Sequence, residues 1–79
     1  MNKYPIWYYV EVDFYSGDYI NNTFSNEENA RKYLNECIEE GELNKNPVIF
    51  YRIARSEVSG GIIVGFVTIT EWNDENEGY

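Results

Sequence analysis

Residues 6–14, IWYYVEVDF, set the architecture of this chain through a strict alternation of side chains. Every even position is apolar or aromatic, and a period of two is the pattern of a strand that buries one face. The side chains that this predicted strand buries are Ile6, Tyr8, Val10, Val12 and Phe14. The opposite face carries aromatic side chains interleaved with carboxylates: Trp7, Tyr9, Glu11, Asp13 and Tyr15.

The residues that follow predict a turn and a second strand. Ser16-Gly17-Asp18 provides turn chemistry, because glycine adopts a positive φ without steric cost. Residues 19–24 then return to an extended pattern, with Ile20 and Phe24 on one side. We therefore predict that residues 6–24 form a β-hairpin.

A helix is predicted directly after this hairpin. Ser25-Asn26-Glu27-Glu28 fits a capping box, in which the Ser25 hydroxyl accepts from the Glu28 N–H and the Glu28 carboxylate accepts from the Ser25 N–H. The apolar residues that follow have the spacing i, i+3, i+4, i+7, i+8, which places them on one stripe: Ala30, Tyr33, Leu34, Cys37 and Ile38. Gly41 is predicted to end the helix as a left-handed C′ residue.

A second hairpin completes the predicted fold. It consists of a strand over residues 47–54, a turn region around Ser59-Gly60-Gly61 and a strand from Ile62 to about Trp72, with Gly65 as a bulge. The order is thus β-β-α-β-β. We predict an α+β fold, with one mainly antiparallel four-stranded sheet and the helix packed on one of its faces.

Composition limits what this chain can be. At 79 residues it is predicted to be a single domain, residues 1–79, in which the acid-rich residues 73–79 form a flexible tail. One cysteine excludes an intrachain disulfide, and the N-terminal apolar run is interrupted by Glu11 and Asp13, unlike a signal peptide. We therefore expect a cytoplasmic protein without a membrane segment.

The residue types disfavour catalysis. The chain has no His, and no carboxylate or Lys is convincingly placed for general acid–base work, so we predict that it is not an enzyme and needs no cofactor. Cys37 lies on the apolar helix stripe, where a thiol acts as a small hydrophobic side chain. Zinc sites need His or paired Cys, and the acids lack the spacing of a calcium loop.

Charge is the more informative signal. The chain carries 14 acidic against 6 basic residues, a net charge of −8, together with 14 aromatic residues. The basic residues are scattered, which disfavours direct binding to nucleic acid, and the acidity disfavours an anionic membrane. We predict a first partner-binding set near the helix C-terminus: Glu36, Glu39, Glu40 and Glu42. The second predicted set lies on the exposed strand face: Glu11, Asp13, Trp7 and Tyr9.

These sets predict a non-enzymatic module that binds a basic protein surface, most concretely an inhibitor that occupies a nucleic-acid site by charge complementarity. In size, acidity and lack of His the chain resembles phage-encoded inhibitors, including DNA mimics and anti-CRISPR proteins. The resemblance is one of composition and carries no binding residues with it. Two alternatives stay open: a self-associating homodimer that pairs through the sheet face or an edge strand, and a small-ligand domain with an aromatic cleft of Trp7, Tyr9 and Tyr51.

Overall fold

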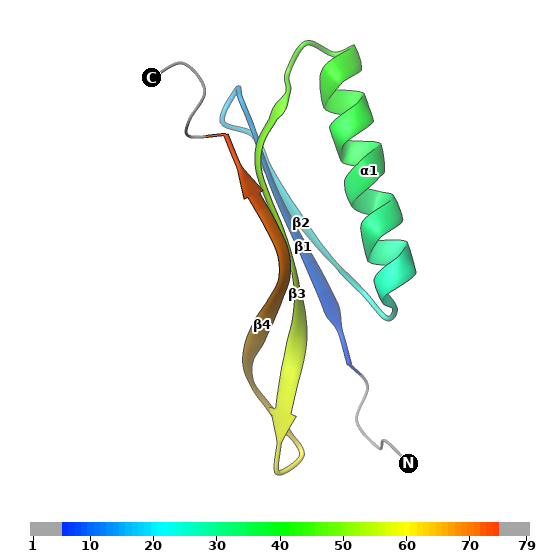
Figure 1. Cartoon of the computed structure of the whole chain (residues 1–79), viewed down its shortest axis with the longest axis vertical. Helices are drawn as coiled ribbons and strands as arrows, with labels where there is room; N and C mark the ends of the chain where they lie inside the picture. Colours follow the sequence, from blue (N-terminus) through cyan, green and yellow to red (C-terminus); the bar gives the residue numbers. More distant parts are fainter. Residues whose placement is uncertain (1–5, 75–79) are drawn as a thin grey trace.

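The computed structural model describes residues 6–74 of the chain. Its five elements are β1 Tyr8–Phe14, β2 Tyr19–Phe24, α1 Glu27–Leu43, β3 Val48–Ser59 and β4 Ile62–Asn73. The strands form one antiparallel sheet in the order β2-β1-β3-β4, and α1 lies across one face of it (Figure 1). The predicted α+β fold with the order β-β-α-β-β is confirmed.

The core lies between α1 and the middle of the sheet. Val10 and Val12 of β1 are fully buried, as the alternation of this strand predicts, and Ile53 of β3 is buried beside them. Full burial of such a side chain contributes about 1.5–3 kcal/mol each. The helix side of the core is formed by the predicted stripe, of which Ala30, Leu34 and Cys37 are buried while Tyr33 and Ile38 pack at the margin.

Both ends of α1 differ from the prediction. The N-cap is Asn26 instead of Ser25: Asn26 has extended backbone angles, and its side-chain oxygen accepts from the Asn29 N–H at 2.8 Å. Gly41 does not end the helix but lies inside it. A Cβ at Gly41 would be 2.7 Å from the Asn46 carbonyl oxygen, so glycine is needed there for close packing. The helix ends two residues later, and Lys45 takes the left-handed φ of 57°.

The two hairpins are built as predicted, with one difference in length. Gly17 has a φ of 97° in the β1–β2 turn, and Gly60 and Gly61 have positive φ in the β3–β4 turn. The β3–β4 register shifts where Glu57 pairs with Gly65 and the next pair is Val58 with Ile63, so the predicted bulge lies beside Gly65. β3 continues to Ser59, however, five residues beyond the predicted end at Ala54.

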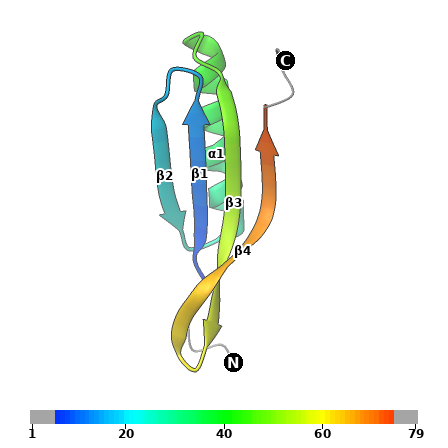
Figure 2. The same ribbon diagram turned by 90° about the vertical axis from the view of Figure 1, so that its left-hand side faces the viewer.

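This extra length produces a protruding arm, defined here as residues 57–66. Twelve-residue strands span roughly 40 Å, whereas the 17 residues of α1 span roughly 26 Å. The pairing of β1 with β3 starts at Tyr8 and Arg55, and Trp7 extends it by one step: the Ser56 N–H donates to the Trp7 carbonyl, and the Trp7 N–H donates to Ser56 Oγ. The arm therefore extends past the sheet as a two-stranded ribbon (Figure 2).

The predicted acidic tail falls mostly outside the described residues. Asn73 is the last residue of β4, and Asp74 follows the strand with its N–H donating to the Ile49 carbonyl at 2.9 Å, so the first two residues of the predicted tail are tied to the sheet. Residues 75–79 are not described by the structure.

Candidate functional site

The C-terminal half of α1 holds the first predicted set of carboxylates, called here the acidic half. Its four members are all exposed: Glu36, Glu39, Glu40 and Glu42. Over these positions the helix rises by roughly 9 Å, and a step of 100° per residue spreads the side chains over roughly 160° of its circumference. The carboxylates thus form an outward-facing arc along the end of the helix.

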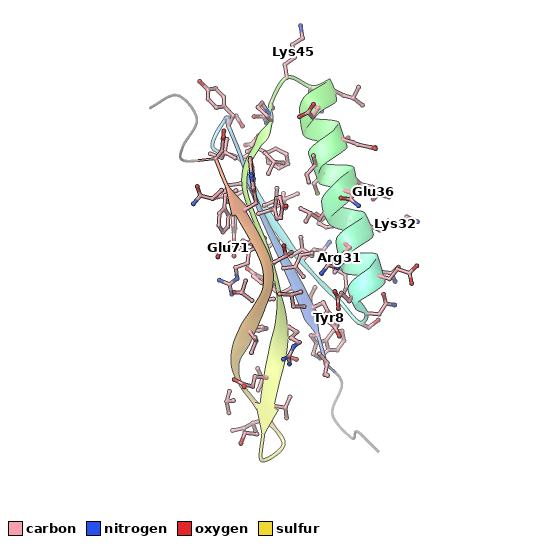
Figure 3. The ribbon with its side chains drawn as sticks, in the orientation of Figure 1. Tyr8, Arg31, Lys32, Glu36, Lys45 and Glu71 are labelled. Carbon is pink, nitrogen blue, oxygen red and sulfur yellow. The ribbon has the colours of Figure 1, made fainter. Side chains whose placement is uncertain are left out.

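No cation neutralises this arc within residues 6–74. The last turn of α1 contains no basic residue, and the one ion pair that α1 makes with residues 6–74 lies in its first half, where Arg31 Nε is 2.8 Å from Glu27 Oε2. Lys45 follows the helix and points away beyond its end (Figure 3). The helix macrodipole places additional negative potential at this C-terminus. The acidic half is therefore the part of the helix where negative charge is concentrated without an ion pair within residues 6–74, with Lys32 one turn before Glu36 as its nearest cation along the helix.

The second predicted set lies on the sheet face opposite α1, called here the open face. Tyr9 and Glu11 are half-buried there by cross-strand neighbours, and Trp7 is 38% exposed. Glu11 faces Arg52 of β3, with Glu11 Oε1 4.0 Å from Arg52 Nη1. This guanidinium partly offsets the acidity of the open face, which is therefore less negative than the alternation of β1 alone predicts.

Tyr9 is also held by side chains of β2 and β4. Its ring lies 5.9 Å from that of Phe66, and its hydroxyl is 3.3 Å from the Tyr19 hydroxyl. This hydrogen bond, with a smaller effect from burial, raises the pKa of Tyr9 to about 12. The contacts are those of an aromatic residue that stiffens a sheet as well as presenting a surface.

The two predicted sets do not form one surface. In Figure 3, Glu36 lies on α1 and Glu71 lies on the side of the sheet away from α1. The helix side and the open face are therefore separated by the thickness of the sheet. Glu11 and Asp13 share the side of Glu71, because their pairing partners place Glu11, Arg52 and Glu71 in one row across three strands. A single flat partner surface therefore contacts one set or the other.

The predicted aromatic cleft of Trp7, Tyr9 and Tyr51 is not formed. Tyr51 lies on the helix side, where it packs against the core and stacks on Trp72 with ring centroids 5.7 Å apart. The chain has instead an open groove of about 250 Å³ between α1 and β4, whose lining residues are Ile38, Glu42, Val48, Tyr51 and Trp72. Tyr51 pairs with Val12 and so shares the helix side with it, whereas Tyr9 lies at an odd position of β1 and faces the other side. Tyr51 and Tyr9 therefore cannot line one cleft.

The sequence interpretation missed an apolar hollow on the open face. It has a volume of about 300 Å³, and its lining residues are Trp7, Tyr9, Thr23, Ile63 and Phe66. The first half of β4 crosses in front of β3 and brings Ile63 and Phe66 toward the start of β1 (Figure 2). One signal could have pointed to it: residues 58–70 contain no charged side chain, although a quarter of the chain is charged.

Reactive groups and metal ligands are not gathered in the described part of the chain. Cys37 is buried in the core as predicted, and this burial raises the pKa of its thiol. Within residues 6–74 no group of three or more acidic or Cys side chains has the geometry to hold a metal ion.

α1 is too short and too highly charged to cross a bilayer, and the described residues include no other helix.

Comparison with known proteins gives no relative. No family model matches the chain, and neither a curated protein nor a solved structure matches it.

Proposed function

We propose that this protein is a non-enzymatic binding module that occupies a basic, nucleic-acid-binding surface of another protein, as phage-encoded DNA mimics and anti-defence inhibitors do. The observation that carries the proposal is the acidic half of α1, in which four exposed carboxylates have no ion-pair partner within residues 6–74. The aromatic open face supports it less, because Arg52 offsets Glu11 there.

These carboxylates resemble phosphates in charge and not in regular spacing. The steps between successive acidic positions along the helix axis are roughly 4.5, 1.5 and 3 Å. The net charge of −8 adds long-range attraction to a basic groove and speeds association. Leu43, which is 83% exposed at the end of α1, adds an apolar side chain beside these carboxylates.

Charge reversal tests the proposal. The protein is immobilised at low salt, a basic DNA-binding protein that it retains is purified, and displacement of labelled duplex DNA from that protein is measured by fluorescence anisotropy. Wild type is expected to displace the DNA. Glu39→Lys/Glu40→Lys is expected to weaken displacement by about tenfold or more, because attraction becomes repulsion at the centre of the arc.

The matched control is Glu28→Lys/Glu71→Lys, which reverses two exposed acids outside the acidic half and changes the net charge of −8 by the same amount. It is expected to stay within about threefold of wild type, because only bulk charge changes. Equal losses in both variants would mean that the arc is not the contact surface. Failure to displace DNA from any retained protein, or turnover of a substrate, would refute the proposed function.

A further inference from the structure

The arm and Trp7 form the most apolar exposed region of the described chain. Large side chains that would normally be covered are open to solvent here: Trp7 38%, Ile62 66%, Ile63 50%, Val64 56% and Phe66 51%. With 150–250 Å² for a large side chain, the exposed parts total roughly 500 Å² over the two faces of the ribbon, because the consecutive residues Ile62 and Ile63 point to opposite faces. We call these five residues the arm patch.

The backbone of the same segment also has no neighbouring strand on one side. β4 is an edge strand of 12 residues, and an edge presents a row of unpaired N–H and C=O groups. Natural edges are usually blunted by charge, proline or shortness. The other edge, β2, has six residues and is polar at its centre, with Asn21, Asn22 and Thr23. β4 has neither charge nor proline from Ile62 to Thr70, and its bulges are its only protection.

The backbone of the arm pairs with no strand outside its own hairpin, and its contacts with the rest of the sheet are made by side chains. Residues beyond Ser56 pair only across the hairpin, and an isolated two-stranded ribbon is marginally stable in water. Trp7 and Tyr9 line its inner side, where they share a hollow with Ile63 and Phe66. The alternate side chains Ile62 and Val64 have no such cover, since both are more than half exposed.

The absence of charge in residues 58–70 favours a second copy of this chain over a basic protein as the partner of the arm patch. A basic partner fits the acidic half of α1, but it gains nothing from a segment in which residues 58–70 carry no charge. Two copies of a chain with a net charge of −8 repel each other over most of their surface, and this segment is where that repulsion is least, because Glu57, which pairs with Gly65, is the one carboxylate of the arm. An uncharged apolar strip is complementary to itself, as a twofold interface requires.

The exposed apolar area of the arm patch is close to the apolar area that one copy buries in a stable dimer. A stable interface buries about 800 Å² per partner, of which about 56–65% is apolar. Pairing of two β4 edges places side chains of both ribbon faces beside the partner copy, so the roughly 500 Å² of the arm patch supplies that apolar share, and the backbone edge of β4 supplies hydrogen-bonding groups for the remainder. We propose that the arm patch is a self-association surface through which two copies of this chain form a symmetric dimer.

The test is the mass of the full chain in solution, measured by sedimentation velocity from micromolar to millimolar concentration. Wild type is expected to approach twice the monomer mass of 9.3 kDa. Val64→Lys places a charge in the arm patch and is expected to raise the dimer dissociation constant at least tenfold. Asn21→Lys adds the same charge at the β2 edge and is expected to leave that constant within about threefold of wild type. Circular dichroism checks that both variants are folded.

A measurement on wild type alone guards against a variant that fails to fold. Backbone amide resonances are followed by NMR as the protein is diluted, and those of Trp7 and residues 62–66 are expected to shift most. A protein that stays monomeric at millimolar concentration would overturn the proposal, as would a mass that grows without limit. Dilution shifts centred on α1 or β2, or equal dissociation constants for Val64→Lys and wild type, would also overturn it.

Discussion

At the scale of single residues, Gly41 is where packing overrides helix propensity. Replacing a glycine inside a helix with alanine normally adds up to about 1 kcal/mol of stability. Here the new Cβ would be 2.7 Å from the Asn46 carbonyl oxygen and 3.2 Å from Phe14 Cε1. Backbone oxygen cannot move as an end of a flexible side chain can, so we predict that Gly41→Ala destabilises the protein by about 1–3 kcal/mol.

Urea denaturation measures this change, with Asn35→Ala as the matched control on the exposed surface of the same helix. The control should be neutral or slightly stabilising, because it gains propensity and touches nothing buried. A Gly41→Ala protein more stable than wild type would show that the helix end relaxes freely around the new methyl group.

Tyr9 gives the protein a pH dependence on the alkaline side. Its pKa lies at about 12 in the folded chain against an ordinary 10.0, so the native state holds this proton more tightly than the unfolded state. The resulting stabilisation is complete below pH 10 and is lost as the pH rises from about 10 to about 12. We predict that the free energy of unfolding falls more steeply over this interval in wild type than in Tyr9→Phe.

Urea titrations at several alkaline pH values give the two profiles. Tyr19→Phe is the informative companion, because it removes the hydrogen bond that is the largest cause of the shift and should return the pKa of Tyr9 toward 10.0. Parallel profiles for wild type and Tyr9→Phe would contradict the assignment.

At the scale of elements, what depends on local periodicity is predicted from sequence, and what depends on distant partners is not. The alternation of residues 6–14 gives β1 its buried face, and the 3.6-residue spacing gives α1 its stripe, because both patterns are set within one element. The cap is misplaced by one residue because Ser25 and Asn26 are both good caps, and only the backbone path decides which one takes extended angles.

The arm shows the same limit more clearly. The sequence pattern predicts a strand end at Ala54, yet pairing with the uncharged first half of β4 carries β3 through Arg55, Ser56 and Glu57 to Ser59. The twist that brings Phe66 to Tyr9 is likewise a property of the paired strands. Sequence therefore locates the acidic half of α1, whose residues are adjacent on one helix, but misses the hollow assembled from β1, β2 and β4.

At the scale of the whole molecule, the two proposed interfaces respond to salt with opposite signs. Binding of a basic partner through the acidic half of α1 is driven by attraction, so salt weakens it. Dimerisation through the arm patch brings together two chains with a net charge of −8, so salt strengthens it by screening their repulsion. The Debye length falls from ~30 Å at 0.01 M to ~8 Å at 0.15 M. Charges that lie on different parts of this molecule therefore interact at the lower salt concentration and are largely screened at the higher one.

We therefore predict that raising ionic strength over this range lowers the dimer dissociation constant while it raises the dissociation constant for the basic partner. Sedimentation velocity measures the first and fluorescence anisotropy the second, on the same preparation of the full chain. Glu39→Lys/Glu40→Lys should flatten the salt dependence of partner binding and leave the arm patch able to associate. Val64→Lys should weaken association through the arm patch and leave the salt dependence of partner binding unchanged. A dimer that dissociates as salt is added would mean that the copies are joined by ion pairs instead of by the uncharged segment 58–70.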